Sequence, residues 1–149
     1  MNALAVLTQV PLLSDVPLDG LQRLSLLCRQ RTFKAGDALM RQGEVSQYMY
    51  ILTEGRVRVE RNGDRGLALV LAELGAGDVV GEMGLLDREP RSATVIALED
   101  TVVVELGAAA LALTLLQFPE VTLALLRIVS QRLRSTDELA QEMRRVGRN

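Results

Sequence analysis

Residues 81–95 read GEMGLLDREPRSATV, and this stretch decides how the rest of the chain is interpreted. Gly81 and Gly84 have no Cβ, so the backbone there can come close to a ligand. Glu82 begins an expected short helix, whose first N–H groups are unpaired and form an anion site. Arg91 adds a planar fork of donors that matches phosphate oxygens, and the Glu82 carboxylate can accept a hydrogen bond from a sugar hydroxyl. These residues together predict a site for a small phosphorylated sugar.

The stretch closely resembles the phosphate-binding cassette of the cyclic nucleotide-binding domain family. That family includes bacterial catabolite activators, the regulatory subunits of cyclic-AMP-dependent kinases and nucleotide-gated channels. Its pattern is Gly-Glu, an apolar residue, a small residue, any residue, Leu, a short loop, and then Arg, one of Ser, Ala or Thr, and Ala. The matching positions here are Gly81, Glu82, Met83, Gly84, Leu86, Arg91, Ser92 and Ala93. Val80 departs from the family, which often has an aromatic residue at that position.

The resemblance assigns roles to these residues and extends over roughly residues 18–140. It implies that Glu82 holds the ribose 2′-hydroxyl and that Arg91 pairs with the cyclic phosphate, assisted by the Ser92 hydroxyl. In the catabolite activators a Thr-Ser pair on the C-terminal helix meets the adenine. The matching residues are Thr136, which is kept, and Asp137, which replaces the Ser. The predicted ligand-binding residues are Gly81, Glu82, Met83, Gly84, Leu85, Arg91, Ser92, Ala93 and Thr136.

The pattern along the chain predicts a fold that is mainly β with flanking helices. Apolar spacing predicts a helix at 18–29, and short runs separated by glycine turns then predict strands between about 31 and 107. Two helices follow, at 108–116 and from 120 to about 145. We therefore expect one domain over residues 1–149: an eight-stranded, jelly-roll-like β-roll with an N-terminal helix, a short cassette helix and two C-terminal helices at about 108–146. The resemblance implies the same architecture.

Composition narrows the class of protein. The chain has 149 residues, 48% of them hydrophobic, which is typical of a globular domain. A net charge of −2 argues against a surface that binds nucleic acid in general. The longest apolar region, at 106–116, is about half of a membrane span, and the N-terminus lacks a basic leader, so a cytoplasmic protein is expected. A single cysteine, Cys28, suits a reducing compartment and is expected to be an inert, core-facing thiol.

The sequence is compared with three classes of function: a ligand sensor, an enzyme and an interaction module. The leading one is a sensor that binds a cyclic 3′,5′-nucleotide, cyclic AMP first and cyclic GMP second, with no other cofactor. Ser92 is compatible with either base. An enzyme is not expected, because metal-dependent chemistry in small β-barrels uses histidine ligands and the chain has no histidine. The alternative is a protein-interaction or oligomerisation module of the same fold that has lost or changed its ligand.

The C-terminal helix leaves two interpretations open. The helix could pack on its own barrel, or it could cover the base of the ligand and pair with a second copy of itself in a homodimer. The seam residues are Leu125, Val129, Arg132, Thr136, Leu139 and Met143. No output module is expected within these residues, so a signal would pass to an effector protein.

Overall fold

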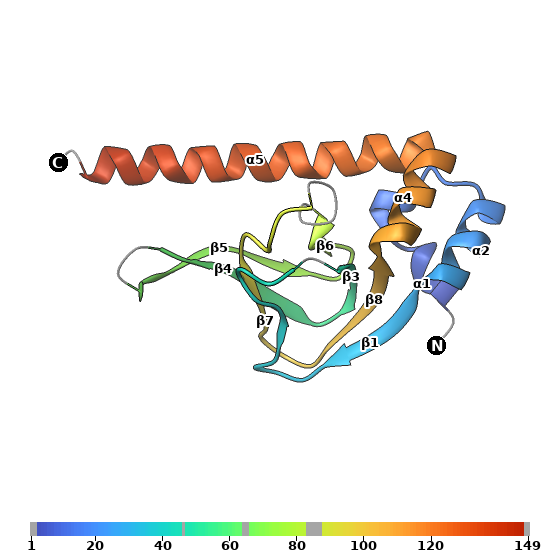
Figure 1. Ribbon diagram of the computed structural model, residues 1–149, viewed down its shortest axis with the longest axis horizontal. Helices are drawn as coiled ribbons and strands as arrows, with labels where there is room; N and C mark the ends of the chain where they lie inside the picture. Colours follow the sequence, from blue (N-terminus) through green and yellow to red (C-terminus); the bar gives the residue numbers. More distant parts are fainter. Residues whose placement is uncertain (1–2, 46, 64–65, 83–87, 148–149) are drawn as a thin grey trace.

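The computed structural model describes residues 3–45, 47–63, 66–82 and 88–147, with the side chains of all of these except 12, 132, 135–143, 146 and 147. The described residues form two antiparallel four-stranded sheets (Figure 1). Sheet A has the strand order β1-β8-β3-β6, and sheet B has the order β2-β7-β4-β5. The strands are β1 (Arg29–Phe33), β2 (Ala38–Met40), β3 (Tyr48–Glu54), β4 (Arg56–Asn62), β5 (Ala68–Gly75), β6 (Val79–Val80), β7 (Thr94–Ala97) and β8 (Thr101–Gly107).

The strands β3 and β8 of sheet A are buried on both faces, β1 is largely exposed, and sheet B is buried on one face. Because side chains alternate along a strand, β3 sends Met49 and Ile51 to one face of sheet A and Tyr50 and Leu52 to the other. The first pair joins a cluster with the helices, which we call the outer cluster. The second pair joins the inner cluster between the two sheets, with Val57, Val80, Val95 and Val103. The outer surface of sheet B carries arginines and glutamates of β4 and β5.

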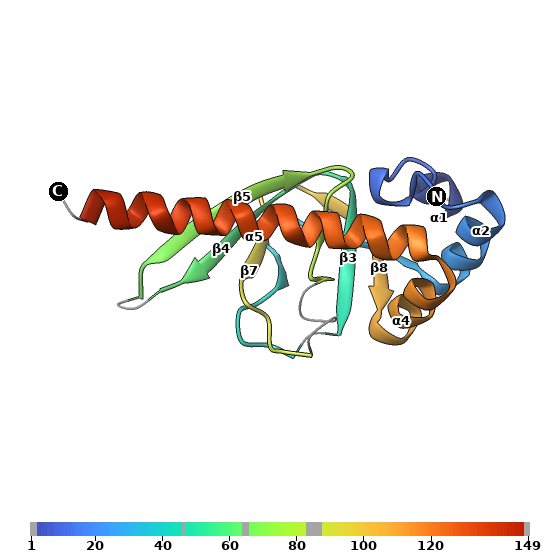
Figure 2. The same ribbon diagram turned by 90° about the horizontal axis from the view of Figure 1, so that it is seen from above.

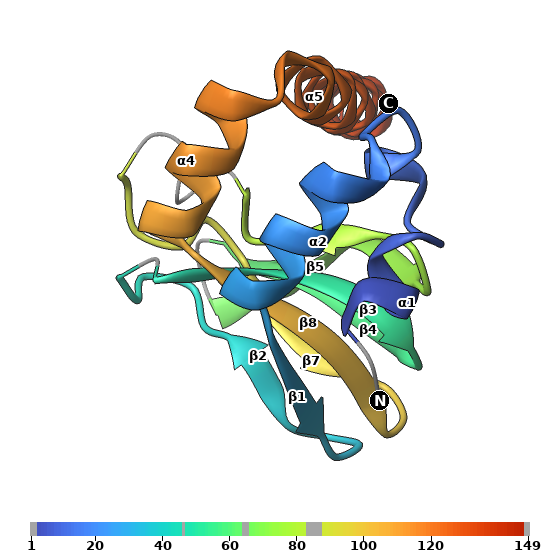
Figure 3. The same cartoon turned by 90° about the vertical axis from the view of Figure 1, so that its right-hand side faces the viewer.

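The helices cover the outer face of sheet A at one end of the roll (Figure 3). They are α1 (Ala3–Leu7), η1 (Pro11–Leu13), α2 (Leu18–Leu27) and α4 (Ala108–Gln117). α5 (Pro119–Gly147) begins at a proline, which suits a first helical turn, and is bent by 116° relative to α4. Its first half packs through Val121 and Leu125 into the outer cluster. From there α5 runs across the roll and past the β4–β5 hairpin (Figure 2).

The predicted fold class is confirmed, and two details differ. The predicted helix at 18–29 ends at Leu27, because Arg29 already pairs with Glu105 as the first residue of β1. α1 and η1 were not predicted, because elements of 5 and 3 residues are too short to show a helical periodicity. Of the predicted cassette helix, Glu82 is helical, and residues 83–87 lie outside the described residues.

Two further predictions concern Cys28 and membranes. Cys28 is partly buried, and burial raises the pKa of its thiol to about 11, which agrees with an inert thiol. Within the described ranges no single helix is long and apolar enough to cross a bilayer. α4 together with residues 119–131 has the required length and apolarity, but the two parts are sharply bent at their junction.

Candidate ligand-binding site

β6 leads directly into Gly81 and Glu82. Gly81 has φ 85°, a left-handed conformation that favours glycine. A Cβ on Gly81 would lie 2.7 Å from Arg91 Nη1 and 2.9 Å from Met40 Cε, so a side chain here would strain the backbone and displace Arg91 and Met40. Glu82 follows with 0% of its surface exposed. A carboxylate is costly to bury, which indicates a specific role for this one.

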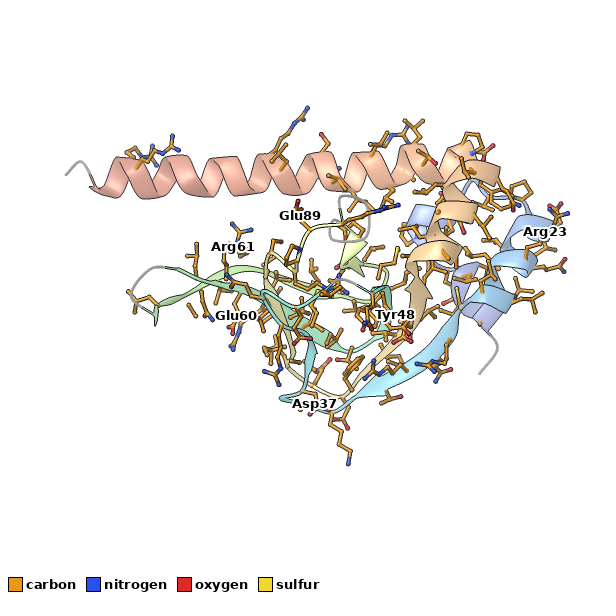
Figure 4. The ribbon with its side chains drawn as sticks, in the orientation of Figure 1. Arg23, Asp37, Tyr48, Glu60, Arg61 and Glu89 are labelled. Carbon is orange, nitrogen blue, oxygen red and sulfur yellow. The ribbon has the colours of Figure 1, made fainter. Side chains whose placement is uncertain are left out.

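Arg91 lies beside this turn and is 6% exposed. Its Nη1 donates to the Gly81 carbonyl at 2.8 Å, and its Nη2 donates to the Tyr48 carbonyl. Tyr48 is the first residue of β3, shown in Figure 4. The guanidinium is therefore fixed between β3 and the cassette turn by neutral carbonyl groups.

The charge of Arg91 is only partly balanced. Burial lowers the pKa of its guanidinium, while the acidic groups of Tyr50, Glu44 and Glu82 raise it. An arginine stays protonated in proteins, so the lowered pKa indicates a cation that has lost solvation. Such a cation favours an anionic ligand, and its planar donors can make paired contacts with phosphate oxygens.

The main chain of Arg91 is anchored to the turn that follows β2. Arg91 N donates to the Glu44 carbonyl at 2.8 Å, and Gly43 N donates to the Arg91 carbonyl at 2.9 Å. Backbone bonds on both sides of one residue hold it as firmly as a strand pair would. Residues from 43–44, 48, 81 and 91 thus meet at one place.

Ser92 and Ala93 continue from Arg91 into β7. Ser92 is exposed and Ala93 is 9% exposed. The Ser92 carbonyl accepts a hydrogen bond from Arg61 Nε at 3.0 Å. The sequence did not predict that Arg61 and the Tyr48 carbonyl lie at the cassette, since only the register of the strands brings them there.

The remaining predicted ligand residues fall beyond what is described. Met83, Gly84 and Leu85 lie outside the described residues, as does Leu86 of the family pattern. Thr136 belongs to α5, but its side chain is not among those described. The structure therefore brings Gly81, Glu82, Arg91, Ser92 and Ala93 together, and their roles as ligand contacts stay predictions.

A second buried carboxylate lies on the inner face of sheet A, on the β1 side of Tyr50. Glu105 on β8 is 3% exposed and accepts hydrogen bonds from Arg29 Nη2 at 2.9 Å and Arg31 Nη1 at 3.2 Å. Tyr50 stands opposite Glu105 on β3, and its ring meets Phe33 edge-on at 5.9 Å. Burial raises the pKa of Tyr50, and the Glu105 carboxylate raises it further.

Other features of the described residues suggest no second site of known type. Within those ranges no cluster of three His, Cys, Asp or Glu side chains could hold a metal ion. A separate open cavity lies between α1 and the end of β3, lined by Val6, Val10, Leu52 and Gly77 among others. None of the predicted ligand residues lines it.

The comparisons with known proteins identify the family of the chain. The sequence model of the family named "Cyclic nucleotide-binding domain" matches residues 30–117. This chain belongs to that family. The match includes every cassette residue and the whole β-roll except Arg29.

Relatives of the chain include both regulators and enzymes. The Cyclic AMP receptor protein of Thermus thermophilus is 34% identical over 109 residues, which is 73% of this chain and 50% of that protein. Human Patatin-like phospholipase domain-containing protein 6 is 34% identical over 118 residues, 74% of this chain and 9% of that protein. The chain thus spans half or less of the length of these relatives.

A solved structure shows the same fold with a nucleotide. A mutant regulatory subunit of a cAMP-independent protein kinase A from Trypanosoma brucei, bound to cAMP in its A site, has a TM-score of 0.79 and 28% identity. The alignment covers 92% of this chain and 49% of that one. The likeness extends over nearly all of the elements in Figure 1.

Proposed function

We propose that this chain binds a cyclic 3′,5′-nucleotide, cyclic AMP ahead of cyclic GMP, and acts as a regulatory sensor. The observation that carries the proposal is the placement of Arg91. Its buried guanidinium is held by the carbonyls of Gly81 and Tyr48, beside the fully buried Glu82. A cation fixed by neutral groups is prepared for an anion, and a carboxylate next to it suits a sugar hydroxyl.

The proposed contacts follow from the chemistry of each group. Arg91 pairs with the equatorial oxygens of the cyclic phosphate, and Ser92 donates its hydroxyl to the same group. Glu82 accepts from the ribose 2′-hydroxyl. Gly81 lets the backbone approach, because a Cβ there would collide with Arg91. Family relatives that bind cAMP support cyclic AMP as the first ligand to test.

We assign this domain no catalytic step. Some relatives are named as phospholipases, so the domain occurs in enzymes as well as in regulators. In such proteins the domain would control a reaction carried out elsewhere in the chain. The proposed partner is therefore an effector, in the same polypeptide or a separate one.

The C-terminal helix is proposed to cover the base through Thr136 and to form a homodimer. Leu125 of the predicted seam packs against its own chain, which favours the intramolecular interpretation for that residue. Leu123, Leu126 and Leu133 are instead 51%, 59% and 59% exposed. Exposed leucines spaced three and seven apart lie along one side of a helix and would suit a second helix.

Calorimetric titration with cyclic AMP, cyclic GMP and cyclic di-GMP tests the function directly. We expect binding of the two mononucleotides and weaker binding of 2′-deoxy cyclic AMP, which lacks the hydroxyl assigned to Glu82. Thermal unfolding provides an independent measure, because a ligand at a hundred times its Kd stabilises a fold by about 2.7 kcal/mol. If no mononucleotide binds or stabilises the protein, the chain is instead an interaction module of the same fold.

A further inference from the structure

Arg61 lies on the inner face of sheet B, next to the cassette. In β4 the side chains of Val57 and Val59 belong to or pack on the inner cluster, and alternation places Arg61 on the same face. Figure 4 shows Arg61 on the side of β4 that is turned toward α5, and Glu60 on the opposite side. An arginine at this end of the inner face is unlike the apolar residues before it.

The hydrogen-bonded ladder between β4 and β7 stops just before the cassette. Its last pairs are Val59 with Val95 and Glu60 with Thr94. One step further, Arg61 would stand opposite Ala93, but the strands no longer pair there. The Arg61 side chain replaces the missing main-chain bond, since its Nε donates to the Ser92 carbonyl at 3.0 Å.

Gln42 supports the same segment from the other side. Its backbone N–H donates to Thr94 Oγ1 at 2.9 Å. Its side-chain carbonyl accepts from Asn62 N at 2.8 Å, and its Nε2 donates to the Asn62 carbonyl at 3.4 Å. The Arg61 side chain and the Gln42 main chain thus each bond the segment 91–94 beyond the end of the regular ladder, and the Gln42 side chain ties the same turn to β4.

We propose that Arg61 is a positioning residue for the ligand site: by bonding the Ser92 carbonyl it extends the β4–β7 ladder to the cassette. This inference rests on the proposed function for its effect on binding. The peptide that carries the Ser92 carbonyl also carries the Ala93 N–H, so fixing one orients the other. Ser92 and Ala93 are then presented to the phosphate in one orientation, and little ordering cost remains when the ligand binds.

Two neutral variants of nearly the same length test the hydrogen bond apart from the charge. Arg61→Gln places an amide N–H where Arg61 Nε stands, and Arg61→Met places a methyl group there. We expect Arg61→Met to bind cyclic AMP about 3- to 10-fold more weakly, because the freed segment must then be ordered when the ligand binds. Arg61→Gln should stay close to the parent. Arg58→Met is the matched control, because Arg58 lies on the same strand and its Nε bonds Glu60 instead.

Hydrogen exchange without ligand gives a measurement that does not depend on the proposed function. The amides of residues 92–94 should exchange faster in Arg61→Met than in Arg61→Gln or Arg58→Met, while the unfolding midpoint of Arg61→Met falls by no more than about 2–4 °C. Equal weakening of binding by Gln and Met would show that Arg61 acts through its charge and would overturn the inference. Unchanged exchange in Arg61→Met would overturn it as well. If the parent binds no nucleotide, the proposed function fails, and the exchange result alone decides the role of Arg61.

Discussion

Two carboxylates in the described part of the roll are buried, Glu105 toward the β1 end and Glu82 toward the cassette end, and the arginines beside them are bonded differently. At the β1 end, Glu105 bonds Arg29 and Arg31, whose side chains are 72% and 47% exposed. At the cassette end the arginine is the buried partner, and its bonds among the described residues end on the carbonyls of Gly81 and Tyr48. In the first arrangement the carboxylate and the arginines bond one another. In the second the bonds of Arg91 end on neutral carbonyl groups, so its charge favours an anionic ligand.

The groups that each arginine bonds distinguish a structural ion pair from a binding site in this domain. Both ends combine acids and arginines, so composition alone does not distinguish them. A carboxylate that is bonded by two arginines stabilises the attachment of an edge strand. An arginine held by neutral backbone groups keeps its charge for a ligand. The two ends should therefore respond to mutation in opposite ways.

The largest effect is expected from Arg91→Ala. Removing the guanidinium leaves a buried phosphate without its partner and should cost about 2–5 kcal/mol of binding, roughly 30-fold or more in Kd. Arg91→Lys should recover only part of the loss, because a point charge cannot make the forked contact. Calorimetric titration measures both. Arg29→Ala is the control from the β1 end and should bind cyclic AMP as the parent does. Unchanged binding by Arg91→Ala would show that the ligand does not use the charge of Arg91.

Gly81→Ala is expected to act second, on stability and binding together. The new methyl group would meet Arg91 Nη1 at 2.7 Å in a backbone conformation that alanine rarely adopts. We expect a loss of about 2–4 kcal/mol in unfolding free energy and markedly weaker binding. Gly36→Ala separates the two causes, because Gly36 has φ 92° with open space around it. That variant should lose about 1–2 kcal/mol and keep its affinity, as denaturation and titration would show.

Glu105→Gln should weaken the fold and leave the ligand site intact. The amide keeps the shape and one acceptor oxygen but loses the charge that both arginines share. Because those arginines are exposed, we expect a modest loss of about 1–2 kcal/mol in unfolding free energy. Urea denaturation and titration on the same sample test this pair of effects. A large loss of affinity with unchanged stability would place Glu105 in the binding site instead.

The smallest effect is expected from Tyr50→Phe, between the two ends. Tyr50 pairs in register with Glu105 on one side and Val80 on the other. Its pKa is raised in the fold, so the stability it contributes is complete below pH 10 and is lost as the pH rises through the folded pKa. Parent and variant should thus have similar unfolding free energies at pH 8. Above pH 10 the parent should lose stability more steeply; parallel curves would exclude this role.

The sequence predicted the fold class because its signals are local. Glycine turns, alternating strands such as residues 56–60 and the helical period of α4 each depend on a few neighbouring residues. The boundary at Arg29 was missed because it depends on Glu105, more than seventy positions away. α1 and η1 were missed because elements of 5 and 3 residues show no period.

The candidate site was also predictable only in part. Gly81, Glu82 and Arg91 could be found because their residue types and spacing carry the chemistry. The sequence could not predict the contacts of the Tyr48 carbonyl, Arg61 and Gln42. Every residue has a main-chain carbonyl, and the register of the strands decides which side chain bonds to which carbonyl. The resemblance supplied Thr136, which stays a prediction.

The backbone bonds that join Arg91 to Gly43 and Glu44 have a consequence for folding. They close a loop of nearly fifty residues, and the pairing of β1 with β8 closes a longer one. Contacts so distant along the chain form late, after the local hairpin of β4 and β5. A folding chain would therefore lack its binding site until the roll has closed, so a ligand would slow unfolding without speeding folding.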